Sequence, residues 1–347
     1  MAGRDRPFSW RRWSLLAGPV VVLLALVLGA LAVRNHPTTR SRGAVPGARA
    51  TAPGTAPGCG RTFTWKAHSW PDCTTTGAPA GARLRPVSGN LIIRKSGTVI
   101  DDVSLKGGID VYADNVTIEN SYILGTGYFG ISQRAGHSGL RVLHNTILGD
   151  VGHGPDSGGE DIGVWTAGTD VTIAYNNISG FGGDIAATGD VHDNYLHGEQ
   201  AFGSTGIGGC DPLPRPIGRC YNHSDAFGID SGRGITLHHN TILEAPIPGG
   251  NSAVELDNDL GAISDVTVTD NFLAGGNYCT YAGSRPGAAA SQHITFTSNA
   301  FSSMYYRNCG QFGPVAYWNP AGQGNLWSGN YWADGSLAGQ QVRPPAS

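Results

Sequence analysis

Lysine is almost absent from this 347-residue sequence. It occurs only at Lys66, Lys95 and Lys106, so a site in the middle of the chain would have to use arginine, histidine, tyrosine or carboxylates. Charged residues of both signs make up only 14% of the chain, and the net charge is -3. This balance gives no reason to expect a partner that is held by bulk charge, such as nucleic acid or an acidic polymer.

No cysteine closely follows the long apolar run at residues 14–33, which argues against a lipoprotein. The run is uncharged and long enough to cross a hydrocarbon core of about 30 Å, and the arginines ahead of it place residues 1–13 in the cytoplasm. We therefore expect a single-pass membrane anchor with an extracellular body. The alternative is a secretion signal cut after Ala32, which would release a secreted protein. Residues 34–58, rich in proline, glycine and alanine, are expected to form a flexible linker.

All six cysteines lie beyond the apolar run, on the oxidising side of the membrane. Their spacing fits no zinc-ligand pattern, so we expect disulfides. Pairing of neighbours along the chain suggests Cys59 with Cys73, Cys210 with Cys220, and Cys279 with Cys309. The folded domain is expected to span residues 59–347.

One pattern, apolar-x-apolar-x-x-Asn-x-apolar, recurs eight times between Val116 and Trp332. The copies begin at Val116, Leu140, Val171, Gly189, Ile235, Val266, Ile294 and Asn325. Apolar residues two apart predict a strand with one buried face, and a period of two does not fit a helix. Because the copies are irregularly spaced, we expect a solenoid whose strands keep register while its turns vary in length.

The sixth position of the pattern is asparagine in every copy but the first, which has Ser121 there. Asparagine tolerates turn geometry, and its amide can bond the equivalent amides one coil above and one coil below. At a spacing of about 4.8 Å these side chains would form an internal ladder. We assign this structural role, and no catalytic one, to Asn145, Asn176, Asn194, Asn240, Asn271 and Asn299.

From Trp70 to about residue 335, including the copy that begins at Ile235, the sequence resembles the parallel β-helix proteins of the pectin-lyase-like superfamily. It is similar in particular to the secreted β-helix proteins of actinobacteria. The resemblance implies coils of three short parallel strands and a long groove that often holds a polysaccharide. Parallel crossovers favour a right-handed coil. The expected fold class is all-β, a right-handed parallel β-helix with an N-terminal transmembrane helix.

The resemblance does not extend to the activity. Pectate lyases carry an Asp-His pair where this chain has His238 and His239, although Asp225-Ala226-Phe227 resembles the run that leads into that pair. Their arginine signature has only a poor counterpart between Arg215 and Arg219, and the ordered acidic motifs of polygalacturonases are missing. A likeness of fold cannot assign the reaction.

Two aspartates stand ten residues ahead of a copy of the pattern: Asp161 before Val171, and Asp225 before Ile235. This predicts equivalent positions two coils apart, about 9.5 Å, with Asp184 on the coil between them. That separation lies at the upper edge of the range between the acid and the base of an inverting glycosidase. The three carboxylates are also candidate calcium ligands. Alternatively, Asp161 and Asp225 cap strands by accepting backbone N–H groups.

His223 ends the largest insertion, residues 198–222, and lies two residues before Asp225. A neighbouring carboxylate orients an imidazole and favours its charged form, so this pair is a candidate general base. His197 and Glu199, at the start of the insertion, can close over the same site. The alternative role of these groups is to hydrogen-bond the insertion to the coil.

Aromatic residues are expected to cover both open ends of the solenoid, where strand edges would otherwise be exposed. Trp65 and Trp70 are assigned to the N-terminal end. The C-terminal end is assigned to Tyr305, Tyr306, Tyr317, Trp318, Trp327 and Trp332, with stacking on sugar rings as the alternative role.

These observations predict an extracytoplasmic, membrane-tethered protein that acts on polysaccharide as a lyase or glycoside hydrolase. The expected catalytic residues are Asp161, His197, His223 and Asp225, and calcium is a candidate cofactor held by Asp161, Asp184 and Asp225. The alternative is a non-catalytic surface protein of the same fold that binds glycan or a cell-envelope partner. We expect a monomer. A deep groove in which His223 and Asp225 converge would favour catalysis, and a shallow polar face would favour binding.

Overall fold

The computed structural model describes residues 60–150, 162–200, 223–247 and 249–344, and the backbone of residues 50–51, 203–204 and 220–221. Within these ranges the chain forms strands and turns, with one short 3-10 helix at Gly335–Leu337. No helix in the described ranges is long and apolar enough to cross a membrane. The predicted anchor at residues 14–33 lies outside them.

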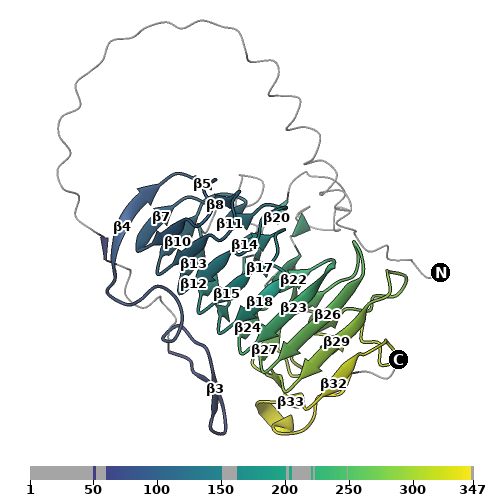
Figure 1. The fold of residues 1–347 in the computed structure, drawn as a ribbon. Coiled ribbons are helices and arrows are strands. Elements are labelled where there is room, and N and C mark those ends of the chain that lie inside the picture. Colours follow the sequence, from purple (N-terminus) through teal and green to yellow (C-terminus); the bar gives the residue numbers. More distant parts are fainter. Residues whose placement is uncertain are drawn as a thin grey trace, which may run out of the picture.

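Three sheets of parallel strands form the body of the molecule (Figure 1). Sheet 1 contains β1 (Ala50–Thr51), β4 (Arg83–Ser88), β7 (Val103–Lys106), β10 (Tyr122–Gly125), β13 (Thr146–Gly149), β16 (Asn177–Ser179), β19 (Tyr195–Leu196), β24 (Thr241–Glu244), β27 (Phe272–Gly275), β30 (Ala300–Phe301) and β33 (Tyr331–Trp332). Only β1 runs antiparallel to its neighbour in this sheet.

The other two sheets have nine strands each. Sheet 2 contains β5 (Leu91–Ile93), β8 (Ile109–Val111), β11 (Phe129–Gln133), β14 (Ile162–Thr166), β17 (Gly183–Ala186), β22 (Ser224–Ile229), β25 (Gly250–Leu256), β28 (Tyr278–Ala282) and β31 (Gly313–Ala316). Sheet 3 contains β6 (Val99–Asp101), β9 (Thr117–Glu119), β12 (Arg141–Leu143), β15 (Thr172–Ala174), β18 (Gly189–His192), β23 (Gly232–His238), β26 (Ile263–Thr269), β29 (Gln292–Thr297) and β32 (Leu326–Ser328).

The chain visits sheets 1, 2 and 3 in turn and then begins the next coil, so each strand pairs with strands of the neighbouring coils. β10, for example, pairs in parallel with β7 and with β13. This arrangement is a parallel β-helix, and it confirms the predicted all-β solenoid.

The repeated sequence pattern spans one strand of sheet 3, a corner, and the start of the next strand of sheet 1. Its second position stays in register through all eight copies, from Thr117 in β9 to Leu326 in β32. The apolar positions on either side point inward and are almost fully buried, as Ile173 and Leu237 illustrate. The alternation in the sequence therefore identified the strands and their register correctly.

The corner depends on the fifth position, which takes a left-handed backbone conformation in every copy. The seven non-glycine residues there have φ between 50° and 59°: Asn120, His144, Tyr175, Asp193, His239, Asp270 and Ser298. The eighth copy has Gly329 at this position. Left-handed geometry is unfavourable for most L-residues, so the fifth position, rather than the asparagine after it, makes the turn.

The asparagines of the sixth position form the predicted ladder. Each backbone N–H donates to the side-chain oxygen of the next coil, at 2.9–3.0 Å, in the order Ser121, Asn145, Asn176, Asn194, Asn240, Asn271, Asn299 and Asn330. The side-chain NH₂ groups also donate to backbone carbonyls of the preceding coil. These asparagines are fully buried or nearly so, which is tolerable only because the ladder satisfies their polar atoms.

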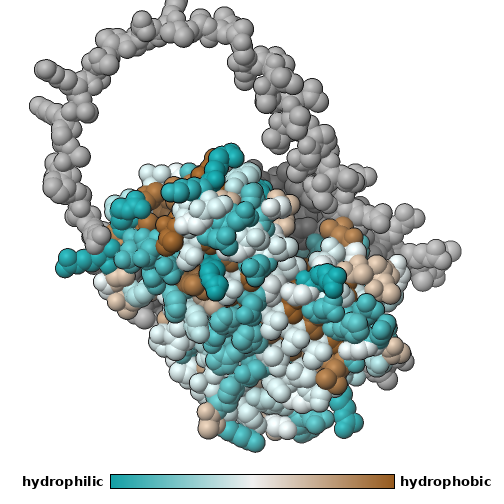
Figure 2. All heavy atoms as spheres, in the orientation of Figure 1, coloured by the Kyte–Doolittle hydropathy of each residue, from teal (hydrophilic) through white to brown (hydrophobic). Residues whose placement is uncertain are grey.

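Aliphatic residues and a few phenylalanines fill the interior of the coil, including Phe227, Phe296 and Phe301. On the face seen in Figure 2, polar and weakly polar residues cover most of the described surface, and apolar residues form only small groups. Two of the aromatic residues predicted to cover the C-terminal end do so, since Trp327 packs on Phe296 with ring centroids 5.1 Å apart and Trp318 packs on both. Tyr305 instead packs against an apolar cluster that includes Phe272, and Tyr317 lies beside Tyr281.

The prediction for Trp65 and Trp70 is wrong. These residues belong to an antiparallel hairpin of β2 (Phe63–Trp65) and β3 (His68–Trp70), which lies against the outer face of the C-terminal half of sheet 1 (Figure 1). Trp65 contacts Tyr331, and the Trp70 indole donates to the carbonyl of Asp270. Aromatic and aliphatic side chains on the outer face of sheet 1 form an apolar surface, and the hairpin buries this surface. Burial of apolar area is favourable, so the two tryptophans lie here and not at the N-terminal end.

One predicted disulfide, Cys279 with Cys309, is present and buried. Cys73 is also disulfide-bonded, while its predicted partner Cys59 lies outside the described residues. Cys210 is likewise outside them, and Cys220 is described only as backbone in the short hairpin of β20 (Gly203–Ser204) and β21 (Cys220–Tyr221).

Candidate functional site

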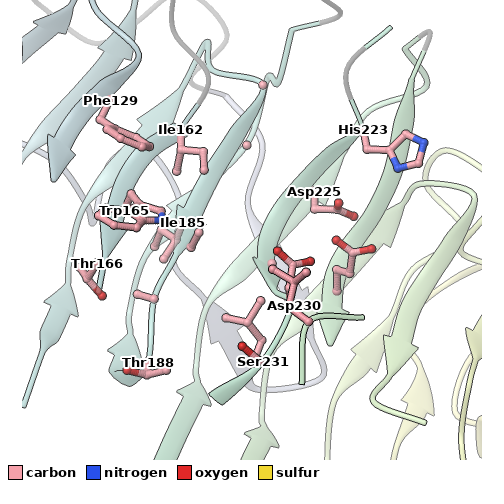
Figure 3. Close-up of a pocket in the computed structure, with 18 of the residues that line it drawn as sticks. Phe129, Ile162, Trp165, Thr166, Ile185, Thr188, His223, Asp225, Asp230 and Ser231 are labelled. Carbon is pink, nitrogen blue, oxygen red and sulfur yellow. The ribbon is translucent and has the colours of Figure 1, made fainter. Parts of the chain in front are cut away.

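A cleft of about 650 Å³ opens on the outer face of sheet 2. One wall is aromatic, because Phe129 from β11 and Trp165 from β14 stack with centroids 5.1 Å apart and planes 17° from parallel. The other wall carries carboxyl groups from β22 and β25, among them Asp225 and Glu255. Figure 3 shows the aromatic side chains on one side of the cleft and Asp225 and Asp230 on the other.

Strand register decides which residues face each other across the cleft. In sheet 2, Ile162 pairs with Gly183, and Gly183 pairs with Asp225. Asp225 therefore shares its position with Ile162, one residue later than the predicted Asp161, which itself lies outside the described residues. The chain from sheet 2 to sheet 3 is one residue longer after β22 than after β14, so counting back from the pattern fails at this point.

Asp225, which is buried, and Glu255, which is partly exposed, form a hydrogen-bonded carboxyl pair at the cleft wall. Burial raises the pKa of both groups, and the pair shares a proton that raises the pKa of Glu255 further and lowers that of Asp225. Ser252 and Asn251 also donate to Asp225 Oδ1, at 2.5 and 3.0 Å. Within the pair, the hydrogen bond therefore favours the proton on Glu255 and the charge on Asp225.

A second carboxyl pair lies behind the first. Asp184 is fully buried and Glu199 almost so, and the two carboxyls are hydrogen-bonded to each other. Burial raises the pKa of Asp184 well above its usual range and that of Glu199 to about 7, so the two carboxyls also share a proton. Glu244 of β24 is buried beside them and bonded by the Ser224 hydroxyl at 3.3 Å, and burial raises its pKa as well.

Asp230 directly follows β22 and lines the cleft. Burial, helped by the charge of Asp257, raises the pKa of Asp230 to about 7. Arg285 is held by other aspartates, with its Nη1 atom 2.6 Å from Asp257 and 3.1 Å from Asp259. Asp230 can thus keep a proton close to neutral pH, which suits a general acid.

The predicted histidines play different roles. His223 lines the cleft and its charge lowers the pKa of Asp225, but its ring points outward in Figure 3, and the described residues show no hydrogen bond between the two. His197 lies away from the cleft lining, where its Nε2 is 2.9 Å from Asn177 Oδ1 and its ring stacks on Tyr195. Burial lowers the pKa of His197 to about 4, so it is neutral at pH 7.

Of the three predicted calcium ligands, Asp184 and Asp225 lie within the described residues and Asp161 does not. Asp184 and Asp225 belong to no group of three described His, Cys, Asp or Glu side chains whose ligand atoms lie within 4.8 Å of one another. Both carboxyls instead take part in shared-proton pairs.

The sequence patterns did not indicate the cleft residues Asp230, Glu255, Phe129 and Trp165. A signal exists for Glu255, since it is a lone acid inside the apolar run of β25. Burying a carboxyl in such a run needs a nearby proton or partner, which points to a functional or structural pair.

No protein-family model matches the chain, and no curated protein sequence matches it significantly. Among solved structures, the chain is similar to the Dettilon tailspike protein (gp208), with 13% sequence identity and a TM-score of 0.32. The similar region covers 70% of this chain and 61% of that chain, so it spans less than two thirds of the tailspike chain. The likeness is too distant to inform the site.

Proposed function

We propose that this protein is a glycoside hydrolase that cuts a neutral polysaccharide in the cleft on sheet 2. The proposal rests on one cleft that combines a stacked aromatic wall with carboxyl groups whose pKa values are raised by burial. Aromatic faces offer the flat apolar surface on which a sugar ring can lie. A protonated and an ionised carboxyl are the two groups that glycoside hydrolysis requires.

The roles follow from the environments of the carboxyls. Asp230 gives its proton to the leaving glycosidic oxygen as the carbon–oxygen bond breaks. Asp225 takes a proton from the water that attacks the anomeric carbon, so the net reaction adds one water. Glu255 is a positioning residue whose hydrogen bond orients Asp225 and favours its ionised form. It is not the acid partner of Asp225, because two hydrogen-bonded carboxyls are closer than the roughly 5–9.5 Å that glycosidases keep between acid and base.

The charge of the cleft supports hydrolysis of neutral sugars over elimination from uronates. The carboxylate that the proposed mechanism places on Asp225 repels a uronate, and the cationic candidates of the lining are His223 and Arg134. Arg134 Nη2 is already 2.6 Å from Asp110 Oδ1. Like charges across a binding surface cost affinity, so an acidic substrate would need an added cation such as calcium.

The setting of this activity is proposed from the sequence. We propose a right-handed coil related to the pectin-lyase-like superfamily, a cytoplasmic tail at residues 1–13, an anchor or signal at residues 14–33 and a linker at residues 34–58. The catalytic domain would then work outside the cell membrane as a monomer. A binding role alone, as a surface protein that holds glycan without cutting it, is the alternative.

The test is an assay of the full chain on neutral and uronate-containing polysaccharides, each with and without calcium. New reducing ends report hydrolysis, and unsaturated uronate products report elimination. We expect hydrolysis of a neutral glycan, loss of about 100-fold or more in kcat for Asp225→Asn and Asp230→Asn, and a smaller loss for Glu255→Gln. Glu119→Gln and Asp102→Asn are matched controls on the coil surface and should leave the rate unchanged.

Glycan affinity, measured in parallel, separates the two candidate functions. Tight binding of a glycan that no condition turns over would favour the binding protein. Turnover that survives both Asp225→Asn and Asp230→Asn would show that the reaction takes place elsewhere.

A further inference from the structure

A group of metal-binding side chains lies on the outer face of sheet 3, away from the cleft. Asp190 and His192 project from β18, and His238 projects from the neighbouring β23. His192 and His238 are directly paired in the strand register, and their rings stack 4.8 Å apart. Their inward neighbours, Val191 and Leu237, are fully buried, so the histidines face outward from a rigid part of the coil.

The three donors are spaced for one small ion. Asp190 Oδ1 is 3.2 Å from His238 Nε2, and Asp190 Oδ2 is 4.0 Å from His192 Nε2. Ligand atoms about 2.1 Å from a tetrahedral Zn²⁺ are about 3.4 Å from one another, which lies between these two distances. Asp190 Oδ1 is also shielded from solvent and has no hydrogen-bond partner in the described part of the chain.

Asp193 orients one of the ligands from behind. Its Oδ2 is 2.7 Å from His192 Nδ1, and since a carboxylate only accepts, this nitrogen must carry the proton. The lone pair of His192 is then on Nε2, the atom that faces Asp190. A carboxylate behind a metal-binding histidine is the usual arrangement that fixes the tautomer and increases ligand basicity.

A neighbouring group of similar composition, His68, His239 and Asp270, lacks this free lone pair. His239 Nε2 faces the carbonyl of Ser69 at 3.0 Å, and its Nδ1 faces the carboxylate of Asp193. Both partners only accept hydrogen bonds, so both ring nitrogens donate and the ring is cationic. The group therefore offers a metal only one histidine.

We propose that Asp190, His192 and His238 form a surface site for a divalent transition metal of the Zn²⁺ type, with Asp193 as its positioning residue. Two imidazoles and one carboxylate suit zinc and its neighbours better than calcium or magnesium, which prefer oxygen ligands. The side chains are 19–48% exposed, so a fourth position stays open to water or to an exogenous ligand. The site is separate from the proposed hydrolytic cleft and does not depend on it.

The test is calorimetric titration of the full metal-free chain, carrying no histidine tag, with ZnCl₂, and absorption spectroscopy with Co²⁺. We expect one ion per chain and a spectrum of low-coordinate cobalt. His192→Ala, His238→Ala and the isosteric Asp190→Asn should each weaken binding by about 100-fold or more. Asp193→Asn should weaken it by about 10- to 100-fold, as loss of a group behind a ligand does.

Two histidine variants locate the ion. His293→Ala removes a surface histidine of the same sheet, whose Nδ1 is 3.2 Å from Asp265 Oδ1. This variant should bind zinc as tightly as the unaltered chain does. His68→Ala should also bind normally. Loss of zinc binding in His68→Ala, with binding retained in His238→Ala, would overturn the assignment. So would a failure of the unaltered chain to bind zinc, or zinc binding that neither His192→Ala nor His238→Ala weakens. Circular dichroism confirms that each variant keeps the strand structure of the unaltered chain.

Discussion

The corner of each coil concentrates backbone strain in a single residue. Ser298 is exposed and has a φ of 56°, a value that glycine adopts freely and other L-residues only at some cost. We expect Ser298→Gly to raise the free energy of unfolding by up to about 1 kcal/mol and Ser298→Val to lower it by about 1–2 kcal/mol. Urea denaturation of both variants measures this. Equal stability of the two would show that the corner is not strained at this residue.

Asp230 gives the proposed reaction a characteristic pH dependence. Because its pKa is raised to about 7, it is protonated below that pH and can act as the acid there. We expect kcat/KM to fall as the pH rises through about 7, and we expect this fall to be absent in Asp230→Asn. A profile that stays flat up to about pH 9 in the unaltered chain would exclude Asp230 as the acid.

Single residues of the cleft were hard to predict from the sequence for a physical reason. Asp225, a predicted site residue, lines the cleft. Its proposed partner Asp161 was derived from a count that assumed equal connections, and the extra residue after β22 shifts the register by one. Glu255 lies in a strand of sheet 2 and Asp230 directly follows another, and the strands of this sheet carry no repeated marker residue.

The strand of sheet 3 with its following asparagine is the element that the sequence determines most completely. The alternation, the corner and the amide ladder are all local, so eight imperfect copies suffice to predict register across the whole coil. The hairpin of β2 and β3 could not be placed in this way. Its contacts, such as Thr241 Oγ1 to the Pro71 carbonyl, join residues that are 170 positions apart and follow no period.

The ladder predicts a large effect for one of its central members. In Asn240→Ala, the Asn194 N–H loses its acceptor, and the carbonyls of Val191 and His238 lose a donor. Leaving buried polar groups unsatisfied costs about 1–3 kcal/mol each, so we expect a loss of about 3–5 kcal/mol in the free energy of unfolding. Asn308→Ala, at an exposed position, is the control and should change it by less than about 0.5 kcal/mol. A loss below about 1 kcal/mol in Asn240→Ala would contradict a structural ladder.

At the scale of the molecule, the buried carboxyls of sheets 1 and 2 make stability depend on pH. The folded-state pKa of Glu199 is raised to about 7, so the folded chain binds more protons than the unfolded chain between about pH 4.5 and 7. Stability therefore falls as the pH rises through this window, by up to about 1.4 kcal/mol per pH unit for one group. Below about pH 6.5 the lowered pKa of His197 acts in the opposite direction, since only the unfolded chain protonates it.

The clearest window is therefore about pH 6.5–8, where His197 is neutral in both states. We expect the urea midpoint to fall across it, and Glu199→Gln to reduce the slope without abolishing it. Asp230, with its pKa of about 7, and His239, whose pKa is raised by Asp193, contribute with the same sign. A midpoint that rises with pH in this window would mean that the carboxyls are ionised in the folded chain.

The two proposed sites lie on different sheets of one rigid coil, so each can be lost without the other. Asp225 and Asp230 face the cleft on sheet 2, and His192 and His238 face outward on sheet 3. Loss of hydrolysis in a cleft variant should accordingly leave zinc affinity unchanged.

The most direct measurement is a crystal structure of the Glu255→Gln chain with an oligosaccharide of the neutral glycan that it binds. We predict a sugar ring on the faces of Phe129 and Trp165, with a glycosidic oxygen within hydrogen-bond reach of Asp230 and the anomeric carbon turned toward Asp225. Oligosaccharide bound along sheet 1 or sheet 3, with the cleft on sheet 2 free of it, would contradict the account.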